Sequence, residues 1–157
     1  MVILFLNQVL IPNIKNTFAT CFYLGKLPIF PGTWASLATL LFWFYLPLNI
    51  IIQIIIIMII FVIGLITSNN VCKELKKDDP SEVVIDEVVG MGLSLFMLPH
   101  NFILYVLAFC LFRFFDIFKP SFIFHIQELP YGWGIMLDDV IAGIVTLIIL
   151  IGFSTIL

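Results

Sequence analysis

The chain has 157 residues, of which 62% are hydrophobic and only 11% are charged, with a formal net charge of −3. Soluble domains carry about 25% charged residues, so this composition excludes an ordinary soluble enzyme and a disordered chain, and the lack of a basic stripe excludes a nucleic-acid binder. The mean hydropathy of +1.21 predicts an integral membrane protein, and the length predicts one domain over residues 1–157.

The first half of the chain predicts two membrane helices. Residues 1–12 are apolar but lack the positive region and cleavage site of a signal peptide, so we expect a segment at the membrane surface. The uncharged run over residues 27–72 is too long for one span of roughly 20 residues, and Pro47-Leu48-Asn49 supplies a turn. Helices are therefore expected over Thr33–Leu46 and Ile50–Ser68.

The second half predicts three more helices. Pro99-His100-Asn101 divides the next apolar run into helices over Glu82–Leu98 and Phe102–Phe118, and a last helix is expected over Asp138–Phe153. Helices satisfy their backbone hydrogen bonds internally, as lipid requires. The predicted fold class is an all-α integral membrane helical bundle of about four to five helices.

The positions of the charged residues predict which membrane face carries the chemistry. Alternating the helices across the bilayer places the turns at residues 47–49 and 99–101 on one side and every charged segment on the other. All seven Lys and Arg residues lie on the charged side, and the positive-inside rule makes that side cytoplasmic. We therefore expect a multi-pass protein with its active site at the cytoplasmic interface.

Two motifs, at Pro31-Gly32 and at Asp86-Glu87, can carry chemistry at this interface. Pro31 and Gly32 set a turn, Thr33 can cap the helix that follows, and free backbone N–H groups there suit a phosphate. A plain loop and cap is the alternative interpretation. Asp86-Glu87 enters an apolar helix, where charge is costly, so the pair is a candidate for metal binding or acid–base chemistry. Its alternative is a favourable interaction with the helix dipole.

Two further motifs lie in the second half. Arg113, Asp116 and Lys119 step by three along one helix face, which suits a cationic clamp for an anion, with Asp116 orienting Arg113 or binding a metal. A salt-bridge ladder is the alternative. Asp138-Asp139 begins the last apolar helix. Five carboxylates on one face are typical ligands of Mg²⁺. No C-x5-R, D-x-D or P-loop spacing occurs, which excludes three other kinds of phosphate site.

The four motifs, IFPGTWAS, DP…VVIDEVVGM (from Asp79-Pro80), FRFFDIFKP and GIMLDDVIAG, resemble in this order the phosphatidylglycerophosphatase A family. Its members are small Mg²⁺-dependent phosphatases of the bacterial inner membrane. The resemblance extends over residues 24–144, although Ala35 and Trp133 stand where the family usually has glycine. The family pattern carries over onto Pro31, Gly32, Thr33, Ser36, Asp79, Asp86, Glu87, Gly90, Arg113, Asp116, Lys119, Pro120, Gly134, Asp138, Asp139 and Gly143.

The resemblance implies an activity and a site. The expected reaction hydrolyses the phosphate monoester of phosphatidylglycerophosphate, giving phosphatidylglycerol and inorganic phosphate in phospholipid biosynthesis. The expected catalytic residues are Asp86, Glu87, Arg113, Asp116, Lys119, Asp138 and Asp139. The expected phosphate-binding residues are Gly32, Thr33, Ser36, Arg113 and Lys119. The expected Mg²⁺ ligands are Asp86, Glu87, Asp138 and Asp139.

The expected partners are the phospholipid substrate and membrane lipid, with no nucleic acid and no obligatory protein partner. The expected attacking group is a water polarised by the metal, and Glu87 is a candidate for the base that accepts its proton. A mechanism with a covalent intermediate stays open as an alternative. Three alternatives also stay open: a phosphatase of another lipid phosphomonoester such as phosphatidate, a small transporter that uses carboxylates as ion relays, and a membrane scaffold without catalysis.

Overall fold

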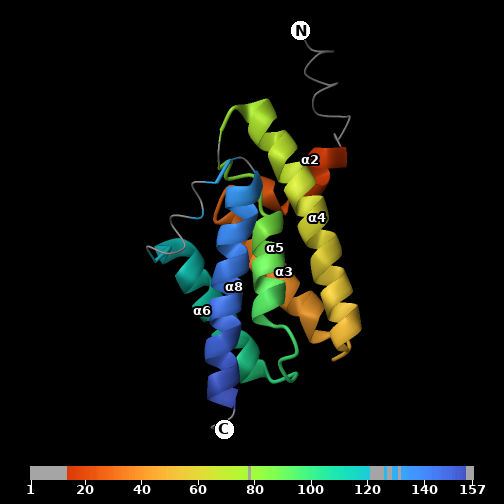
Figure 1. Cartoon of the computed structure of the whole chain (residues 1–157), viewed down its shortest axis with the longest axis vertical. Helices are drawn as coiled ribbons and strands as arrows, with labels where there is room; N and C mark the ends of the chain where they lie inside the picture. The colour runs from red at the N-terminus through yellow and green to blue at the C-terminus, as the bar shows by residue number, and fades with distance from the viewer. Residues whose placement is uncertain (1–13, 78, 121–125, 127–128, 131, 155–157) are drawn as a thin grey trace.

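The computed structural model describes residues 14–77, 79–120, 126, 129–130 and 132–154, so the surface segment expected over residues 1–12 lies outside the described residues. The described part is helical and contains no strand, which confirms the all-α prediction there (Figure 1). In chain order the elements are α2 (Ile14–Ala19), the 3-10 turn η1 (Leu24–Lys26), α3 (Pro31–Phe44), α4 (Ile50–Leu75), α5 (Ile85–Ser94), α6 (Phe102–Phe118) and α8 (Gly132–Ser154).

The five long apolar helices were all predicted, and α6 has the predicted bounds. α3 begins two residues before the expected start, at Pro31, because proline has a φ suited to the first helical position. Phe30 occupies the N-cap position without a side-chain cap, so the predicted cap by Thr33 is wrong. The backbone N–H of Thr33 instead donates to Phe30 O at 3.0 Å, inside the first turn.

Three other helices also differ from their predicted bounds. α4 continues to Leu75 and ends at Lys76, which has a left-handed φ of 52° and donates its N–H to Cys72 O. α8 begins at Gly132 rather than Asp138. α5 is shorter than predicted, because a turn with a hydrogen bond from Val83 N to Pro80 O precedes it.

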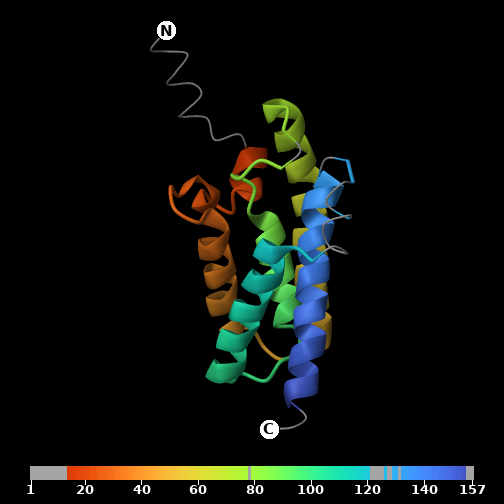
Figure 2. The same cartoon turned by 90° about the vertical axis from the view of Figure 1, so that its left-hand side faces the viewer.

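α5 is the central helix of the bundle and contacts α3, α4, α6 and α8 (Figures 1 and 2). Its closest approach is to α8, through two glycines. A Cβ added at Gly143 would overlap the carbonyl oxygen of Gly90, and a Cβ added at Gly90 would lie 2.6 Å from Asp139 O. Only glycine permits this contact between backbones, and the contact places the first turn of α5 beside Asp138 and Asp139.

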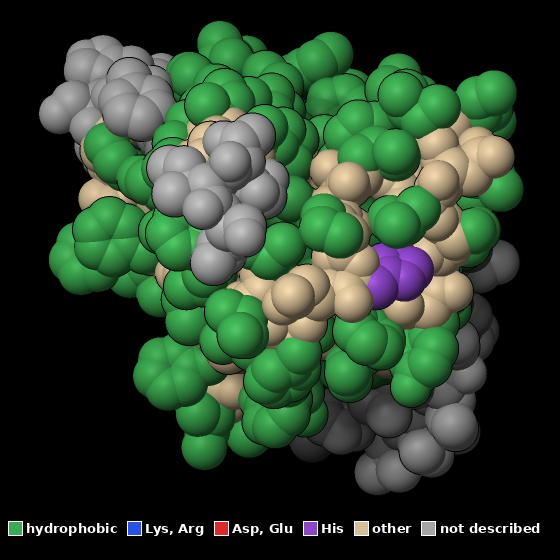
Figure 3. All heavy atoms as spheres, turned by 90° about the horizontal axis from the view of Figure 1, so that it is seen from below, with side chains coloured by type: hydrophobic (Ala, Val, Ile, Leu, Met, Phe, Trp, Pro, Cys, Tyr) green, Lys and Arg blue, Asp and Glu red, His purple; other side chains and the backbone are tan. Residues whose placement is uncertain are grey.

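The two uncharged turns meet at the end of the bundle far from the charged loops, as the sequence predicted. Gln53 is fully buried, and its amide donates to Pro47 O at 3.2 Å while its Oε1 accepts from Met97 N at 2.8 Å. The His100 ring stacks on Phe44 with centroids 5.8 Å apart. Figure 3 shows this end from below: among the coloured residues in view, no Lys, Arg, Asp or Glu side chain is seen.

Within the described residues, two helices are long and apolar enough to cross a membrane, namely α4 and the segment Gly132–Phe153 of α8. The most apolar part of α4 has a mean hydropathy of 3.2, yet only 22% of it is buried inside the bundle. Ile51 is 65% exposed and Ile59 is 54% exposed. Continuous apolar surface of this size is typical of a lipid or protein contact.

Candidate active site

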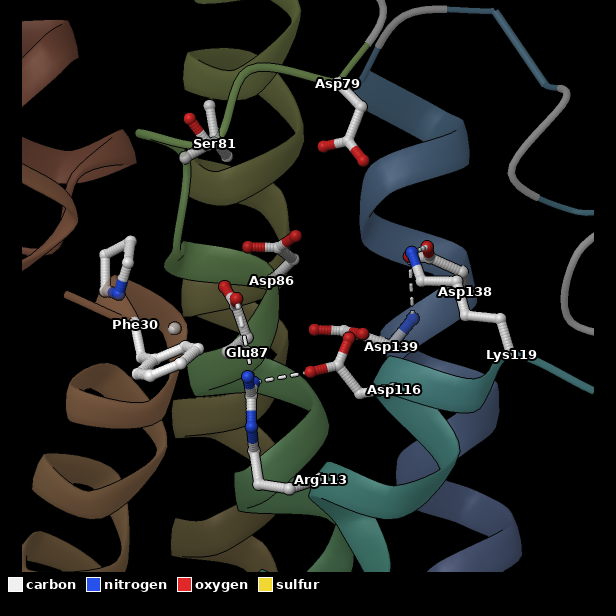
Figure 4. Close-up of a pocket in the computed structure, with 13 residues that line it drawn as sticks. Phe30, Asp79, Ser81, Asp86, Glu87, Arg113, Asp116, Lys119, Asp138 and Asp139 are labelled. Atoms are coloured by element: carbon white, nitrogen blue, oxygen red, sulfur yellow. Dashed lines mark hydrogen bonds and ion pairs between the residues drawn. The ribbon is translucent and has the colours of Figure 1, made fainter.

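The four motifs meet around one pocket of about 250 Å³ at the charged end of the bundle (Figure 4). The start of α3, the loop before α5, the first turn of α5, the end of α6 and the second turn of α8 all contribute to it. Its lining residues are Phe30, Pro31, Gly32, Asp79, Ser81, Val83, Asp86, Glu87, Arg113, Asp116, Lys119, Asp138 and Asp139.

Three carboxylates form the acidic side of the pocket. One oxygen each from Asp86, Glu87 and Asp139 lies within 4.8 Å of the other two. Asp86 Oδ1, Glu87 Oε2 and Asp139 Oδ2 are buried and have no hydrogen-bond partner among the described residues. Buried carboxylate oxygens without partners are costly, and a cation would offset that cost. Three hard oxygen donors at this spacing fit Mg²⁺ better than a softer metal.

Burial also changes the proton affinity of the two carboxyls on α5. α5 has ten residues and a length of roughly 15 Å, too short to cross a bilayer. Burial raises the pKa of Glu87 to about 7, a rise that the hydrogen bond from Asp86 and the charge of Arg113 partly offset. Burial, followed by the charges of Glu87 and Asp139, raises the pKa of Asp86 well above its usual range. Both groups therefore favour a proton or a cation over an unpaired charge.

Arg113 extends from α6 into the pocket and joins its cationic side to its acidic side. Its Nη1 forms an ion pair with Asp116, one turn further along α6, and lies 3.8 Å from Glu87 Oε1. Figure 4 draws dashed lines from this guanidinium to Asp116 and to Glu87. Asp116 is thus placed to orient Arg113, one of the two roles that the sequence left open.

Lys119 is the second cation of the pocket and is paired with Asp138. Its Nζ lies 2.6 Å from Asp138 Oδ2, and its backbone caps α6 with a left-handed φ of 37°. Burial lowers the pKa of Lys119, but the charge of Asp138 and its hydrogen bond outweigh that effect and raise the pKa to about 12. The other oxygen of Asp138 accepts the backbone N–H of Asp139 at 2.8 Å.

The four expected metal ligands are therefore divided into two groups. Asp86, Glu87 and Asp139 face one another, whereas Asp138 uses both of its oxygens in hydrogen bonds. Only Asp139 of the adjacent pair contributes to the three-carboxylate group.

The expected phosphate-binding residues are also divided. Gly32 lines the pocket beside the acidic group: a Cβ added there would overlap Glu87 Oε1 and lie 3.2 Å from Arg113 Nη1. Ser36 is fully buried and donates its hydroxyl to Gly32 O at 2.8 Å within α3. Thr33, like Ser36, lies outside the pocket lining. Gly32 and the two cations are thus the expected phosphate-binding residues that the fold brings together.

A family model described as Phosphatidylglycerophosphatase A matches residues 17–154 of the chain. The chain belongs to the phosphatidylglycerophosphatase A family. The match covers all the residues of the pocket, and it confirms the resemblance seen in the four motifs.

Three relatives cover most of the chain. Phosphatidylglycerophosphatase A of Haemophilus influenzae is 36% identical over 148 residues, which are 92% of this chain and 91% of that protein. Phosphatidylglycerophosphatase A of Escherichia coli is 34% identical over 139 residues, 85% of this chain and 80% of that protein. A protein of Bacteroides thetaiotaomicron, named as a candidate phosphatidylinositol-3-phosphatase, is 34% identical over 139 residues, 83% and 87% of the two chains. These names confirm the expectation of a phosphatase. No solved structure matches the chain.

Phe30 and Ser81 line the pocket of this phosphatidylglycerophosphatase A family member, although the sequence analysis did not select them. Phe30 directly precedes the Pro31-Gly32 turn, and Ser81 directly follows Asp79-Pro80. Their position next to two motifs was the indication in the sequence that they could line the pocket. Their side chains, an exposed phenyl ring and an exposed hydroxyl, gave no chemical reason to choose them over other loop residues.

Proposed function

We propose that this chain is a Mg²⁺-dependent phosphatase that hydrolyses the terminal phosphate monoester of phosphatidylglycerophosphate, yielding phosphatidylglycerol and inorganic phosphate. The observation that carries the proposal is the convergence of two cations, Arg113 and Lys119, with three buried carboxylates around one pocket. Cations suit the phosphoryl oxygens, and the carboxylates suit the metal that phosphoryl transfer commonly uses. Family membership supplies the lipid substrate.

Asp86, Glu87 and Asp139 would hold the Mg²⁺ ion. When bound, the ion neutralises negative charge on the phosphoryl oxygens and makes water more acidic. Their three oxygens without hydrogen-bond partners are the atoms that support this assignment.

The side chains of the pocket would perform the remaining tasks. Arg113 and Lys119 bind the non-bridging oxygens of the phosphate, with Asp116 and Asp138 holding the two cations in position. Water oxygen then forms a bond to phosphorus as the bond from phosphorus to the glycerol oxygen breaks. A carboxylate of the pocket accepts one proton of the water, and the departing glycerol oxygen takes up a proton from solvent, which leaves a free hydroxyl and inorganic phosphate.

The same proposal includes a membrane setting. α4 and α8 would span the bilayer, with α3, α5 and α6 packed beside them in a single domain over residues 1–157. The charged end would face the cytoplasm of a bacterial cell, at the surface of the inner membrane. The acyl chains of the substrate remain in lipid while its headgroup reaches the pocket. The reaction completes a step of phospholipid biosynthesis and needs no protein partner.

The names of the relatives favour a particular class of lipid. Phosphatidylglycerophosphate and phosphatidylinositol 3-phosphate each carry a phosphodiester and, further out on the headgroup, a phosphomonoester. Phosphatidate has a monoester alone. A transporter is less well supported, because an ion relay needs carboxylates that are accessible from both sides. The described carboxylates of this chain gather at one end of the bundle.

The test is phosphate release from phosphatidylglycerophosphate by the full chain in detergent, with Mg²⁺ and with EDTA. Asp139→Asn and Lys119→Ala should each lose most of the activity, while Glu74→Gln and Lys77→Ala, which remove the same charges at exposed positions outside the pocket, should retain it. Full activity in EDTA, or in both pocket variants, would overturn the metal-dependent reaction.

A further inference from the structure

A second hollow, of about 540 Å³, adjoins the catalytic pocket. Pro31 and Ser81 line both hollows, so the two are neighbours across one wall. The second hollow contains one cationic side chain, Lys26, and one acidic side chain, Glu82. Neither residue belongs to the motifs that form the catalytic pocket.

The backbone around Lys26 is fixed against the loop that precedes α5. A Cβ added at Gly25 would overlap the carbonyl oxygen of Glu82, and Gly25 N donates to Thr20 O at 2.9 Å. Lys26 N donates to Tyr23 O at 3.0 Å, and Lys26 Nζ lies 5.1 Å from the centroid of the Tyr23 ring. These contacts hold the short turn η1 in place against the loop. The ammonium group of Lys26, at the end of this turn, therefore lies at the hollow.

Lys26 differs from the two cations of the catalytic pocket in forming no ion pair with a carboxylate of the described residues. Arg113 and Lys119 each form an ion pair with an acid of the same site. None of the ion pairs among the described residues includes Lys26, and its side chain is exposed. An exposed ammonium beside a phosphate pocket, with an aromatic ring as its neighbour, is available to a second anionic group.

An apolar surface continues from the second hollow. Leu27 and Pro28 line both this hollow and a third one, which Ile29 and Trp34 complete. Ile29 is 65% exposed and Trp34 is 50% exposed. The order along this surface is thus the catalytic pocket, then the ammonium of Lys26, then exposed apolar side chains. A lipid that carries a terminal monoester, an inner diester and acyl chains has its groups in the same order.

We propose that Lys26 forms a second anion subsite that binds the phosphodiester of the substrate while its terminal phosphate occupies the catalytic pocket. This inference rests on the proposed function and names the residue that selects among lipid phosphomonoesters. Glu82 can accept a hydrogen bond from the free hydroxyl of the glycerol between the two phosphates. Phosphatidate cannot fill both subsites, because its single phosphate is the one that must be hydrolysed.

The first measurement compares turnover of two lipids by the full chain in mixed micelles. Lys26→Met removes the charge but keeps an apolar stem, and Lys77→Met makes the same change at an exposed position outside all three hollows. A lost hydrogen bond to a charged group lowers affinity by about tenfold or more. Lys26→Met should therefore raise KM for phosphatidylglycerophosphate about tenfold with little change in kcat, and Lys26→Arg should restore it. KM for phosphatidate, or its inhibition constant if it turns over too slowly, should change less than twofold.

The second measurement needs no turnover. Phosphatidylglycerol carries the diester and lacks the monoester, so its binding in mixed micelles, followed by the fluorescence of the tryptophans, reports the second subsite alone. Lys26→Met should weaken this binding about tenfold and Lys77→Met should not. Equal losses for the two lysine variants would indicate only general attraction to anionic lipid and would overturn the proposal, as would equal losses on both lipids. If the wild-type chain releases no phosphate from phosphatidylglycerophosphate, the proposed function fails, and the binding measurement still decides whether Lys26 holds a diester.

Discussion

Gly32 lies against the carboxylate of Glu87, so closely that a Cβ on this glycine would overlap Glu87 Oε1. The two residues are 55 positions apart in the chain, in the first turns of α3 and α5. The contact makes the Pro31-Gly32 turn a wall of the acidic group, and it leaves Glu87 no room to turn toward α3. Gly32 therefore positions the carboxylate of Glu87, a role that could not be predicted from the sequence.

Gly32→Ala should therefore reduce activity without unfolding the protein. The new methyl group displaces the end of a side chain, which can move, and it also lies 3.2 Å from Arg113 Nη1. A displacement of about 1 Å in a catalytic group can cost about 100-fold in rate, so we expect a loss of at least tenfold in kcat. Gly152→Ala is the matched control, since nothing lies within 4 Å of a Cβ there. Equal activity of the two variants would contradict this role of Gly32.

The pair of Lys119 and Asp138 can be tested by a double-mutant cycle. Lys119→Ala should lose about 100-fold in kcat/KM, and Asp138→Asn a smaller amount, because Asp138 acts by holding the ammonium 2.6 Å away. The double variant should then be no worse than Lys119→Ala. If the two losses multiply instead, Asp138 has a separate task, such as the metal binding that the sequence predicted.

Mg²⁺ binding should strengthen as the pH rises from 6 to 8. Without the ion, burial holds the pKa of Glu87 near 7, so below that pH a proton occupies the carboxyl and Mg²⁺ must displace it. The apparent affinity should fall by up to about tenfold per pH unit below 7 and level off above it. Calorimetric titration of Mg²⁺ in buffers of different ionisation enthalpy would count the protons released. An affinity that is the same at pH 6 and pH 8 would exclude Glu87 from the ligand set.

Gly143→Ala should destabilise the bundle. Its Cβ would overlap the carbonyl oxygen of Gly90, and this backbone atom can move only if α5 and α8 separate. Overpacking of this kind costs about 1–3 kcal/mol, measurable as a lower Tm in detergent. Because the same contact places Asp139 beside α5, activity should fall together with stability. An unchanged Tm, equal to that of Gly152→Ala, would show that the two helices tolerate a wider separation.

Most helices could be predicted from the sequence, because charged residues are excluded from segments that lie in lipid and are left at their ends, where water is near. The absence of charge over residues 27–72 and the turns at Pro47 and Pro99 predicted α6 and the start of α4 as observed, and α3 to within two residues. The starts of α3 and α8 were less predictable. The start of α3 depends on Pro31 at the first helical position, and α8 begins at Gly132, six residues before Asp138.

The candidate site was predictable as a set of charged residues but not as an arrangement. The four motifs do meet at one end, as alternating helices require. The roles within the set depend on contacts between distant residues: Asp138 turns to Lys119 while Asp139 turns to α5. Two neighbours on a helix point about 100° apart, and the sequence does not state which of them faces which helix.

The sequence by itself determined an all-α chain with its charges gathered at one end, because burying or lipid-embedding an unpaired charge is costly wherever it occurs. The family followed from the motifs. Only the tertiary structure decided which carboxylates share a space, through the contact of Gly90 with Gly143, and that Lys26 lies in a hollow beside the pocket. Those facts depend on the distance between backbones of separate helices, which is set by the packing of the whole bundle and not by any local pattern.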